Sequence, residues 1–140
     1  MNNFGMFVEH VGDHNVSIGA FEATNSALEK FDDVSMFFQD IGPKPSKNNF
    51  GMFNATDIAH FSGKLVVTFA DGLKVVKKEV NKRKVYYYFG LEKNKRIYDL
   101  LESTDNVEII CKEVDAPYVR TKLGREPIIC NDLSKVSEVV

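Results

Sequence analysis

The sequence predicts an α/β fold in which a mostly parallel, doubly wound sheet of about six or seven strands lies between two layers of helices. Short β-rich runs alternate with amphipathic stretches along the 140 residues. Strands joined by helical crossovers are parallel, because a short turn cannot return the chain to the start of a parallel neighbour. Largely apolar runs, such as the one from Val85 to Phe89, are typical of strands covered on both faces. The prediction is therefore a three-layer, Rossmann-like sandwich.

The composition predicts a single domain over residues 1–140. Hydrophobic residues make up 44% of the chain and charged residues 27%, which excludes a disordered or low-complexity protein. No apolar run approaches the roughly 20 residues of a membrane helix, and no secretory signal is legible, so we expect a cytoplasmic protein without a membrane span. The net charge of −2 attracts no polyanion in general, and we expect no nucleic-acid partner.

The first half of the chain holds three predicted strands and a long helix. A strand at 4–9 is followed by a polar turn and by Ser17, the predicted N-cap of a helix that runs to about residue 30. A strand at 34–39 comes next. Prolines and a glycine prevent regular structure in the loop at 41–46, and a short strand follows at 50–53. The apolar face of the helix is formed by Ile18, Phe21, Ala23, Leu28 and Phe31.

The second half continues the alternation. Capping side chains after residue 53 begin a brief helix, in which His60 is predicted to pack on the apolar side, and Gly63 ends it. Asp71 begins another helix, whose apolar positions Leu73, Val76 and Val80 share one face. The other predicted strands are 64–69, 84–89, 107–112 and 128–130, and the other predicted helices are 93–101, 116–123 and 133–140.

Two cysteines and a basic cluster have structural interpretations. Cys111 and Cys130 lie in apolar runs, where we expect small buried side chains rather than a disulfide framework. The basic cluster precedes the tyrosines at 86–88, a combination that can bind nucleic acid. We interpret it as the solvated face and exit turn of a helix, with the tyrosines inside the sheet. Its members are Lys74, Lys77, Lys78, Lys82, Arg83 and Lys84.

One hexapeptide, Asn-Asn-Phe-Gly-Met-Phe, occurs at 2–7 and again at 48–53. Both copies enter a predicted strand. No longer period accompanies them, so we interpret the repeat as a coincidence helped by similar strand environments rather than as a duplicated domain.

The best candidate site follows the first predicted strand. Ligands of doubly wound sheets bind beyond the carboxyl ends of the strands, and a helix N-terminus favours a phosphate or another anion. The candidate residues in this loop and helix start are His10, Gly12, Asp13, His14, Asn15 and Ser17. Asp71 and Glu92 follow later strands, as does Thr68. Helix capping and ordinary loop polarity are the alternative explanation.

The sequence lacks the motifs of several common kinds of catalytic and nucleotide-binding site. The sequence contains no glycine-rich dinucleotide fingerprint, no P-loop and no nucleophile elbow. His10 and His14 are four residues apart, but Gly12 and Asp13 favour a turn between them, so we predict no metal site. Either histidine could act as a general base, with Glu9 or Asp13 orienting the ring.

The order of elements resembles one Rossmann-like half of a GT-B-type glycosyltransferase. The resemblance rests on the loop at 12–15 that opens onto the helix at 16–23, and on 85–92 followed by Ile109-Ile110-Cys111-Lys112. In that family two such halves face each other, the amino-terminal half receiving the acceptor and the carboxy-terminal half the nucleotide sugar. The paired-glutamate and basic donor-binding pattern of the carboxy-terminal half is missing. A version this compact would suit a small genome, such as that of a phage.

If the chain resembles the amino-terminal half, His10, Gly12, Asp13 and His14 line the cleft, with Asp71 and Glu92 nearby. The resemblance implies a domain that binds a nucleotide sugar or a sugar acceptor and requires no other cofactor. The alternative is a non-catalytic interaction module that pairs with itself or with another protein, since the chain has 11 Phe and 5 Tyr without a decisive catalytic motif. A receiver-like or flavin-binding domain fits less well, because Glu9 is a poor match to a receiver's acidic cluster.

Overall fold

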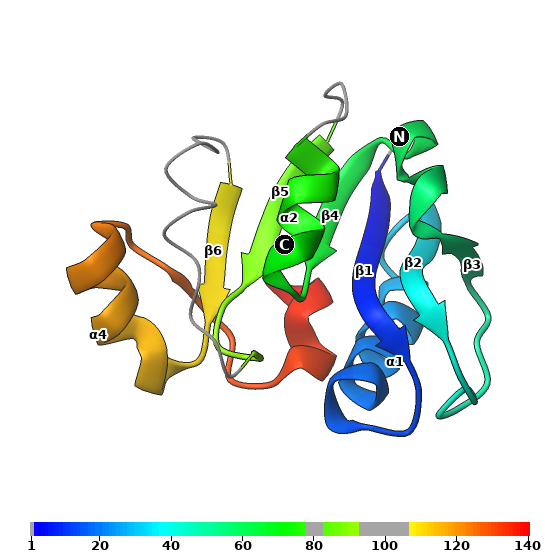
Figure 1. The fold of residues 1–140 in the computed structure, drawn as a ribbon, viewed down its shortest axis with the longest axis horizontal. Helices are drawn as coiled ribbons and strands as arrows, with labels where there is room; N and C mark the ends of the chain where they lie inside the picture. The colour runs from blue at the N-terminus through cyan, green and yellow to red at the C-terminus, as the bar shows by residue number, and fades with distance from the viewer. Residues whose placement is uncertain (1, 78–82, 93–106) are drawn as a thin grey trace.

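The computed structural model describes residues 2–77, 83–92 and 107–140. Seven parallel strands form one sheet in the order β3-β2-β1-β4-β5-β6-β7, and all arrows point the same way (Figure 1). This confirms the predicted parallel, doubly wound sheet. The strands are β1 (Asn3–Val11), β2 (Asp33–Ile41), β3 (Gly51–Asn54), β4 (Gly63–Val67), β5 (Arg83–Tyr88), β6 (Val107–Cys111) and β7 (Ile128–Ile129).

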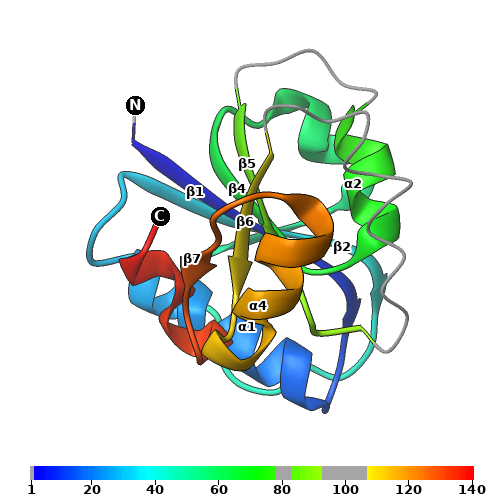
Figure 2. The ribbon, with the colours of Figure 1, turned by 90° about the vertical axis from the view of Figure 1, so that its left-hand side faces the viewer.

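Helices cover both faces of the sheet, which gives the three predicted layers (Figure 2). One face packs on α1 (Asn15–Ala27) and on the 3₁₀ segment η4 (Leu133–Glu138). The other packs on η1 (Ala55–His60), α2 (Ala70–Lys77) and α4 (Ala116–Tyr118). A short η2 (Glu113–Asp115) precedes α4, and the π-helical η3 (Val119–Leu123) continues it. In the described part of the chain, no helix combines the length and apolar character needed to cross a membrane.

Three details of the helices differ from the prediction. The predicted helix at 133–140 is a short 3₁₀ segment over Leu133–Glu138, and 116–123 begin as an α-helix and continue as a π-helix. His60 is exposed at the end of η1, so its predicted packing on an apolar face is wrong. The predicted helix at 93–101 lies outside the described residues. So do Val80, Lys78 and Lys82, as does the side chain of Lys77.

The predicted helix start at Ser17 is also wrong. The helix α1 begins at Asn15, and His14 is its N-cap. Ser17 is fully buried in the first turn, where its hydroxyl accepts a hydrogen bond of 3.1 Å from the Gly12 N–H. Ser17 therefore accepts a hydrogen bond from the backbone of the loop before the helix, and the His14 ring accepts one from a backbone N–H in the first turn of α1.

Strands β1 and β2 extend beyond their neighbours at the carboxyl edge. The pairing of β1 with β4 ends at Phe7 opposite Val67, whereas its pairing with β2 continues to Val11 opposite Ile41. Chain order also reverses here, because β2 and β3 lie on one side of β1 while β4 to β7 lie on the other. Because β4 ends before β1 does, space is left beside the last residues of β1, at the topological switch point where doubly wound folds bind ligands.

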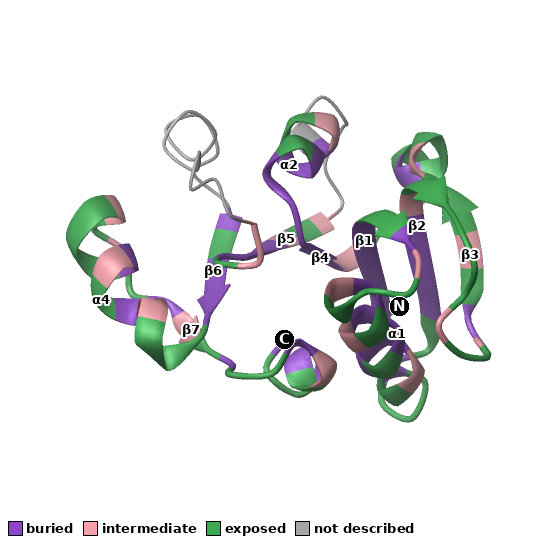
Figure 3. Cartoon of the chain, turned by 60° about the horizontal axis from the view of Figure 1, so that its bottom comes forward, coloured by how far each residue is buried: buried purple, intermediate pink, exposed green. Residues whose placement is uncertain are grey.

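The repeated hexapeptide occupies both neighbours of β2 in one register. Met6 and Met52 both lie opposite Met36, and Phe7 and Phe53 both lie opposite Phe37. The methionine row faces the layer that contains α1, and the phenylalanine row faces the layer that contains η1. The structure thus confirms the similar strand environments expected for the two copies. They differ in burial, because β1 is central and β3 is an edge strand (Figure 3).

The cysteines and the strand tyrosines are buried, as predicted. Cys111 and Cys130 belong to the cores on opposite faces of the sheet, and both are free thiols. Tyr88 donates from its hydroxyl to the carbonyl oxygen of Cys130. Burial raises the pKa of the Cys111 thiol from 9.0 to about 11, and the nearby Asp115 carboxylate adds to this shift.

The raised pKa of Cys111 predicts a loss of stability at alkaline pH. The unfolded thiol ionises near pH 9 and the folded one near pH 11, so its contribution is full below pH 9 and is lost as the pH rises through about 11. We expect the free energy of unfolding, measured by urea denaturation, to fall over this range, and to fall less steeply in Cys111→Ala. Tyr87 and Tyr88 contribute in the same direction, because burial raises their hydroxyl pKa values too. An unchanged pH dependence in Cys111→Ala would contradict the assignment.

Candidate functional site

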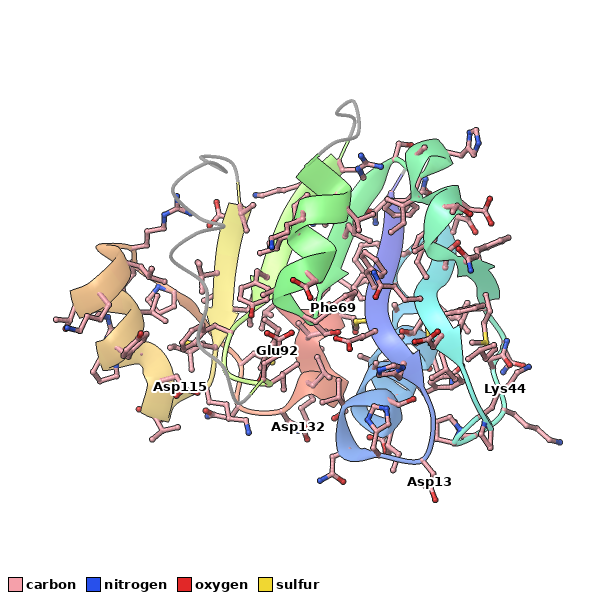
Figure 4. The ribbon with its side chains drawn as sticks, in the orientation of Figure 1. Asp13, Lys44, Phe69, Glu92, Asp115 and Asp132 are labelled. Atoms are coloured by element: carbon pink, nitrogen blue, oxygen red, sulfur yellow. The ribbon has the colours of Figure 1, made fainter. Side chains whose placement is uncertain are left out.

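A small cleft opens at the switch point. Its volume is about 160 Å³, and it lies between the end of β1, the start of α1 and the segments that follow β4 and β5. The side chains that line it are Glu9, His10, His14, Val16, Thr68, Phe69, Leu91 and Glu92. Phe69 and Glu92 lie at the carboxyl ends of the strands, on the same edge as Asp13 (Figure 4). The cleft therefore has the position that the fold class predicts for a ligand.

The end of β4 anchors the inner part of the cleft. Thr68 donates twice to the carbonyl oxygen of Phe7, from its N–H at 3.1 Å and from its hydroxyl at 2.9 Å. The ring of Phe69 meets that of Phe7 edge to face, with centroids 4.9 Å apart. Val16 and Leu91 add half-buried apolar surface from α1 and from the segment after β5. A fixed apolar wall of this kind can hold the non-polar face of a small molecule.

His10 is held between two carboxylates. Its Nε2 lies 3.2 Å from Oε1 of Glu9, and its Nδ1 lies 3.2 Å from Oδ2 of Asp40 on the neighbouring strand. The strand register brings this pair together, because His10 lies opposite Asp40 in the ladder of β1 and β2. All three side chains are exposed, so the contacts fix the direction of the ring more than they stabilise the fold. Both ring nitrogens of His10 already face partners.

His14 connects the cleft to α1. Its Nδ1 accepts a hydrogen bond of 3.4 Å from the Ser17 N–H, and its carbonyl oxygen accepts one of 2.9 Å from Ile18. Side-chain caps satisfy donors that the helix itself cannot pair. The imidazole thus occupies part of the helix N-terminus that the sequence predicted as an anion site.

Glu92 caps the other helix at this edge. Its Oε1 accepts a hydrogen bond of 2.9 Å from the N–H of Ala70, which is the first residue of α2. Asp71 follows in the first turn, where its carboxylate lies 3.7 Å from Nζ of Lys74 and faces solvent. Glu92 therefore ties the segment after β5 to the end of β4, and it lines the cleft from that position, whereas Asp71 lies outside the lining.

The carboxyl edge is rich in negative charge. The carboxylates at or just after the strand ends are Glu9, Asp13, Asp40, Asp71, Glu92, Glu113, Asp115 and Asp132, and the lysines near them are Lys44, Lys74, Lys112 and Lys135. Lys44 donates to Asn48 on its own loop. Among the residues described, the lining of the cleft includes neither lysine nor arginine. The same part of the chain also contains no group of three or more His, Cys, Asp or Glu side chains placed to hold a metal ion.

No protein-family model, curated protein or solved structure matches the chain. The candidate site therefore depends on its geometry.

The structure brings together part of the predicted site. His10, His14 and Glu92 line the cleft, together with Glu9 and Thr68. Five predicted residues lie outside the lining: Gly12, Asp13, Asn15, Ser17 and Asp71. Asp13 and Asn15 are exposed, and Gly12 and Ser17 bond to each other.

The apolar part of the lining, which consists of Val16, Phe69 and Leu91, was not predicted from the sequence. Each of them neighbours a polar residue at a strand or helix end. Their hydrophobicity alone is equally typical of the core, so only their position after a strand could have indicated the cleft.

The arrangement is better suited to holding a ligand than to abstracting a proton with imidazole. His10 has a carboxylate at each nitrogen, and His14 uses Nδ1 in a helix cap. What the cleft offers is a set of oriented hydrogen-bonding groups beside an apolar wall. Sites that recognise small polar molecules have this composition.

Proposed function

We propose that the protein binds a small, uncharged, hydroxyl-rich molecule in the cleft at the switch point, and that a sugar of the acceptor type is the ligand. The observation that carries the proposal is the pairing of carboxylates with an apolar wall in one cleft. A carboxylate accepts hydrogen bonds from hydroxyl groups, and the C–H face of a sugar ring is apolar. Glu9 is the carboxylate we assign to the ligand hydroxyls.

Charge and size favour an acceptor sugar over a nucleotide sugar, the other ligand that the glycosyltransferase resemblance implies. A diphosphate would face Glu9 and Glu92 and, among the described residues of the lining, would meet no lysine or arginine. The His14 ring already satisfies a donor at the start of α1. The volume of about 160 Å³ is also small against the roughly 300–1,000 Å³ of pockets that enclose drug-sized ligands. One sugar ring fits this space better than a nucleotide sugar does.

Titration of the ¹⁵N-labelled protein with monosaccharides and with nucleotide sugars tests the proposal. We expect monosaccharides to shift the amide signals of Phe69, Leu91 and Val16. Glu9→Gln should weaken binding by roughly threefold to tenfold, because glutamine replaces one acceptor oxygen with an amide N–H donor and loses one hydrogen bond from the ligand. Glu29→Gln is the matched control, because Glu29 is exposed just beyond α1 and outside the cleft. Binding that is equal in the two variants would contradict the assignment of Glu9.

An interaction module is the second candidate function, and the outer edge of the sheet favours it. Phe53 on the edge strand β3 is 43% exposed, and Ile41 on β2 is 53% exposed. Exposed apolar side chains next to an outer strand are a common feature of self-association. A protein that binds none of the sugars and sediments as a dimer would support this function in place of sugar binding.

A further inference from the structure

His14 has a place both in a helix and in the cleft. It is the N-cap of α1, and it lines the cleft. The chain has three histidines, and the other two differ from it. His10 has a carboxylate at each nitrogen, whereas His60 is exposed at the end of η1. Of the three, His14 is the one whose ring is bonded to a backbone N–H.

The cap bond determines which nitrogen of His14 carries the proton. Nδ1 accepts from the Ser17 N–H, so it must present a lone pair there. A neutral imidazole has one acceptor nitrogen and one donor nitrogen. The proton of the His14 ring is therefore on Nε2, and the hydrogen bond at one nitrogen fixes the tautomer at the other.

We propose that His14 is a specificity-determining residue, which offers its Nε2–H to an acceptor oxygen of the ligand while its Nδ1 holds the start of α1. The inference rests on the proposed function, because it concerns the same cleft. In this arrangement the two residues have opposite hydrogen-bonding roles toward the ligand. Glu9 accepts from the ligand, and His14 donates to it.

This division selects a class of ligand. A hydroxyl group both donates and accepts, so a polyol or a sugar satisfies Glu9 and His14 together. An ammonium group only donates, so a simple amine satisfies the carboxylate and leaves the His14 N–H without an acceptor. A site of this kind rejects a ligand that leaves one of its polar groups without a hydrogen-bond partner, because the unpaired group costs binding free energy. We therefore expect neutral polyols and sugars to bind more tightly than alkyl amines of the same size, although the cleft is acidic.

The two bonds of the ring also connect ligand binding to the helix. Hydrogen bonds arranged in a chain polarise one another, so donation from Nε2 strengthens acceptance at Nδ1. A bound ligand should thus reinforce the cap and protect the first amides of α1, including that of Ser17, from hydrogen exchange. Ligands that bind elsewhere on the protein would leave this exchange unchanged.

Long-range ¹⁵N–¹H correlation of the histidine rings tests the tautomer without any ligand. We expect the His14 ring to show an unprotonated Nδ1 and a protonated Nε2, with its signals identified by their loss in His14→Asn. The opposite tautomer, protonated at Nδ1, would overturn the inference whatever the protein binds.

Two substitutions at His14 separate the cap from the ligand contact. Asparagine is among the best N-cap residues, so His14→Asn keeps the cap but removes the ring, whereas His14→Ala removes both. In titrations with the monosaccharide that binds the wild type best, both variants should bind roughly threefold to tenfold more weakly. The urea midpoint should fall in His14→Ala and stay near the wild-type value in His14→Asn. His60→Asn is the control and should change neither binding nor midpoint, because His60 is exposed and outside the cleft.

The outcomes distinguish this inference from the proposed function. If the wild type binds sugars and His14→Asn binds them equally well, the role of His14 is wrong and sugar binding stands. If alkyl amines bind as tightly as the matched polyols, the division between donor and acceptor is wrong. If the wild type binds no sugar, the proposed function fails and the role of His14 in ligand selection fails with it.

Discussion

Replacing Phe7 with alanine is expected to lower the free energy of unfolding by about 3–5 kcal/mol. Phe7 is fully buried in the centre of the sheet, where its ring meets Phe69. The substitution removes a large apolar side chain and leaves a cavity that the neighbouring strands cannot fill by closing in. Equilibrium unfolding in urea measures the effect. Because the lost ring supports Phe69, the cleft should also lose ligand affinity.

Phe53→Ala is the matched control for Phe7→Ala. The same five residues precede Phe53, since it ends the second copy of the hexapeptide, and it lies opposite the same Phe37. It is 43% exposed on the edge strand, with its ring centroid 6.0 Å from that of Phe37. We expect it to cost less than half as much stability as Phe7→Ala. Equal losses at the two positions would show that burial is not the cause.

Replacing Gly63 with alanine should produce the second large effect, a loss of about 3 kcal/mol or more. Gly63 starts β4 with a φ of 130°, a conformation that residues with a side chain rarely adopt. A Cβ at this position would lie 2.7 Å from the carbonyl oxygen of Asn3 and 2.9 Å from its Cβ. These atoms belong to the start of β1, so relief requires the two central strands to move apart. Urea unfolding again measures the loss.

Gly124→Ala separates backbone strain from the clash. Gly124 ends η3 with a φ of 62°, and a Cβ there would meet nothing within 4 Å. Its substitution should cost about 1 kcal/mol, the ordinary penalty for the left-handed conformation. A loss in Gly63→Ala no larger than in Gly124→Ala would mean that the contact with Asn3 relaxes at no cost.

The sequence predicted the strands well because each is a short apolar run bounded by turn residues. The ends of β1 and β2 were missed. His10 and Asp40 are polar, Ile41 is exposed, and Val11 begins the predicted turn, yet all four continue the ladder because the two strands pair with each other beyond β4. The strand order and the positions of the cores depend on contacts between distant segments, which local periodicity does not encode.

The candidate site was predicted from topology rather than from a motif. Strand ends indicated His10, His14 and Glu92, and these three line the cleft because every strand ends at the same edge of a parallel sheet. The cap of α1 was missed because histidine is an uncommon N-cap, while Ser17 has the usual chemistry of one. Asp71 follows β4, but the first turn of α2 directs its carboxylate to solvent and to Lys74. Side-chain direction within a turn cannot be predicted from spacing alone.

The hexapeptide on both sides of β2 makes the folding of this sheet ambiguous at its centre. A nascent β2 can pair with either copy and obtain the same methionine and phenylalanine rows, so its own ladder does not distinguish the native neighbour. The distinction comes from the far side of the first copy. Gly5 leaves room for Leu65 and Phe61, whose side chains would lie 2.9 Å from a Cβ there, whereas a Cβ at Gly51 would meet the ring of Phe53. The contact with β4 at Gly5, rather than the ladder of β2, therefore distinguishes the central copy of the hexapeptide from the edge copy.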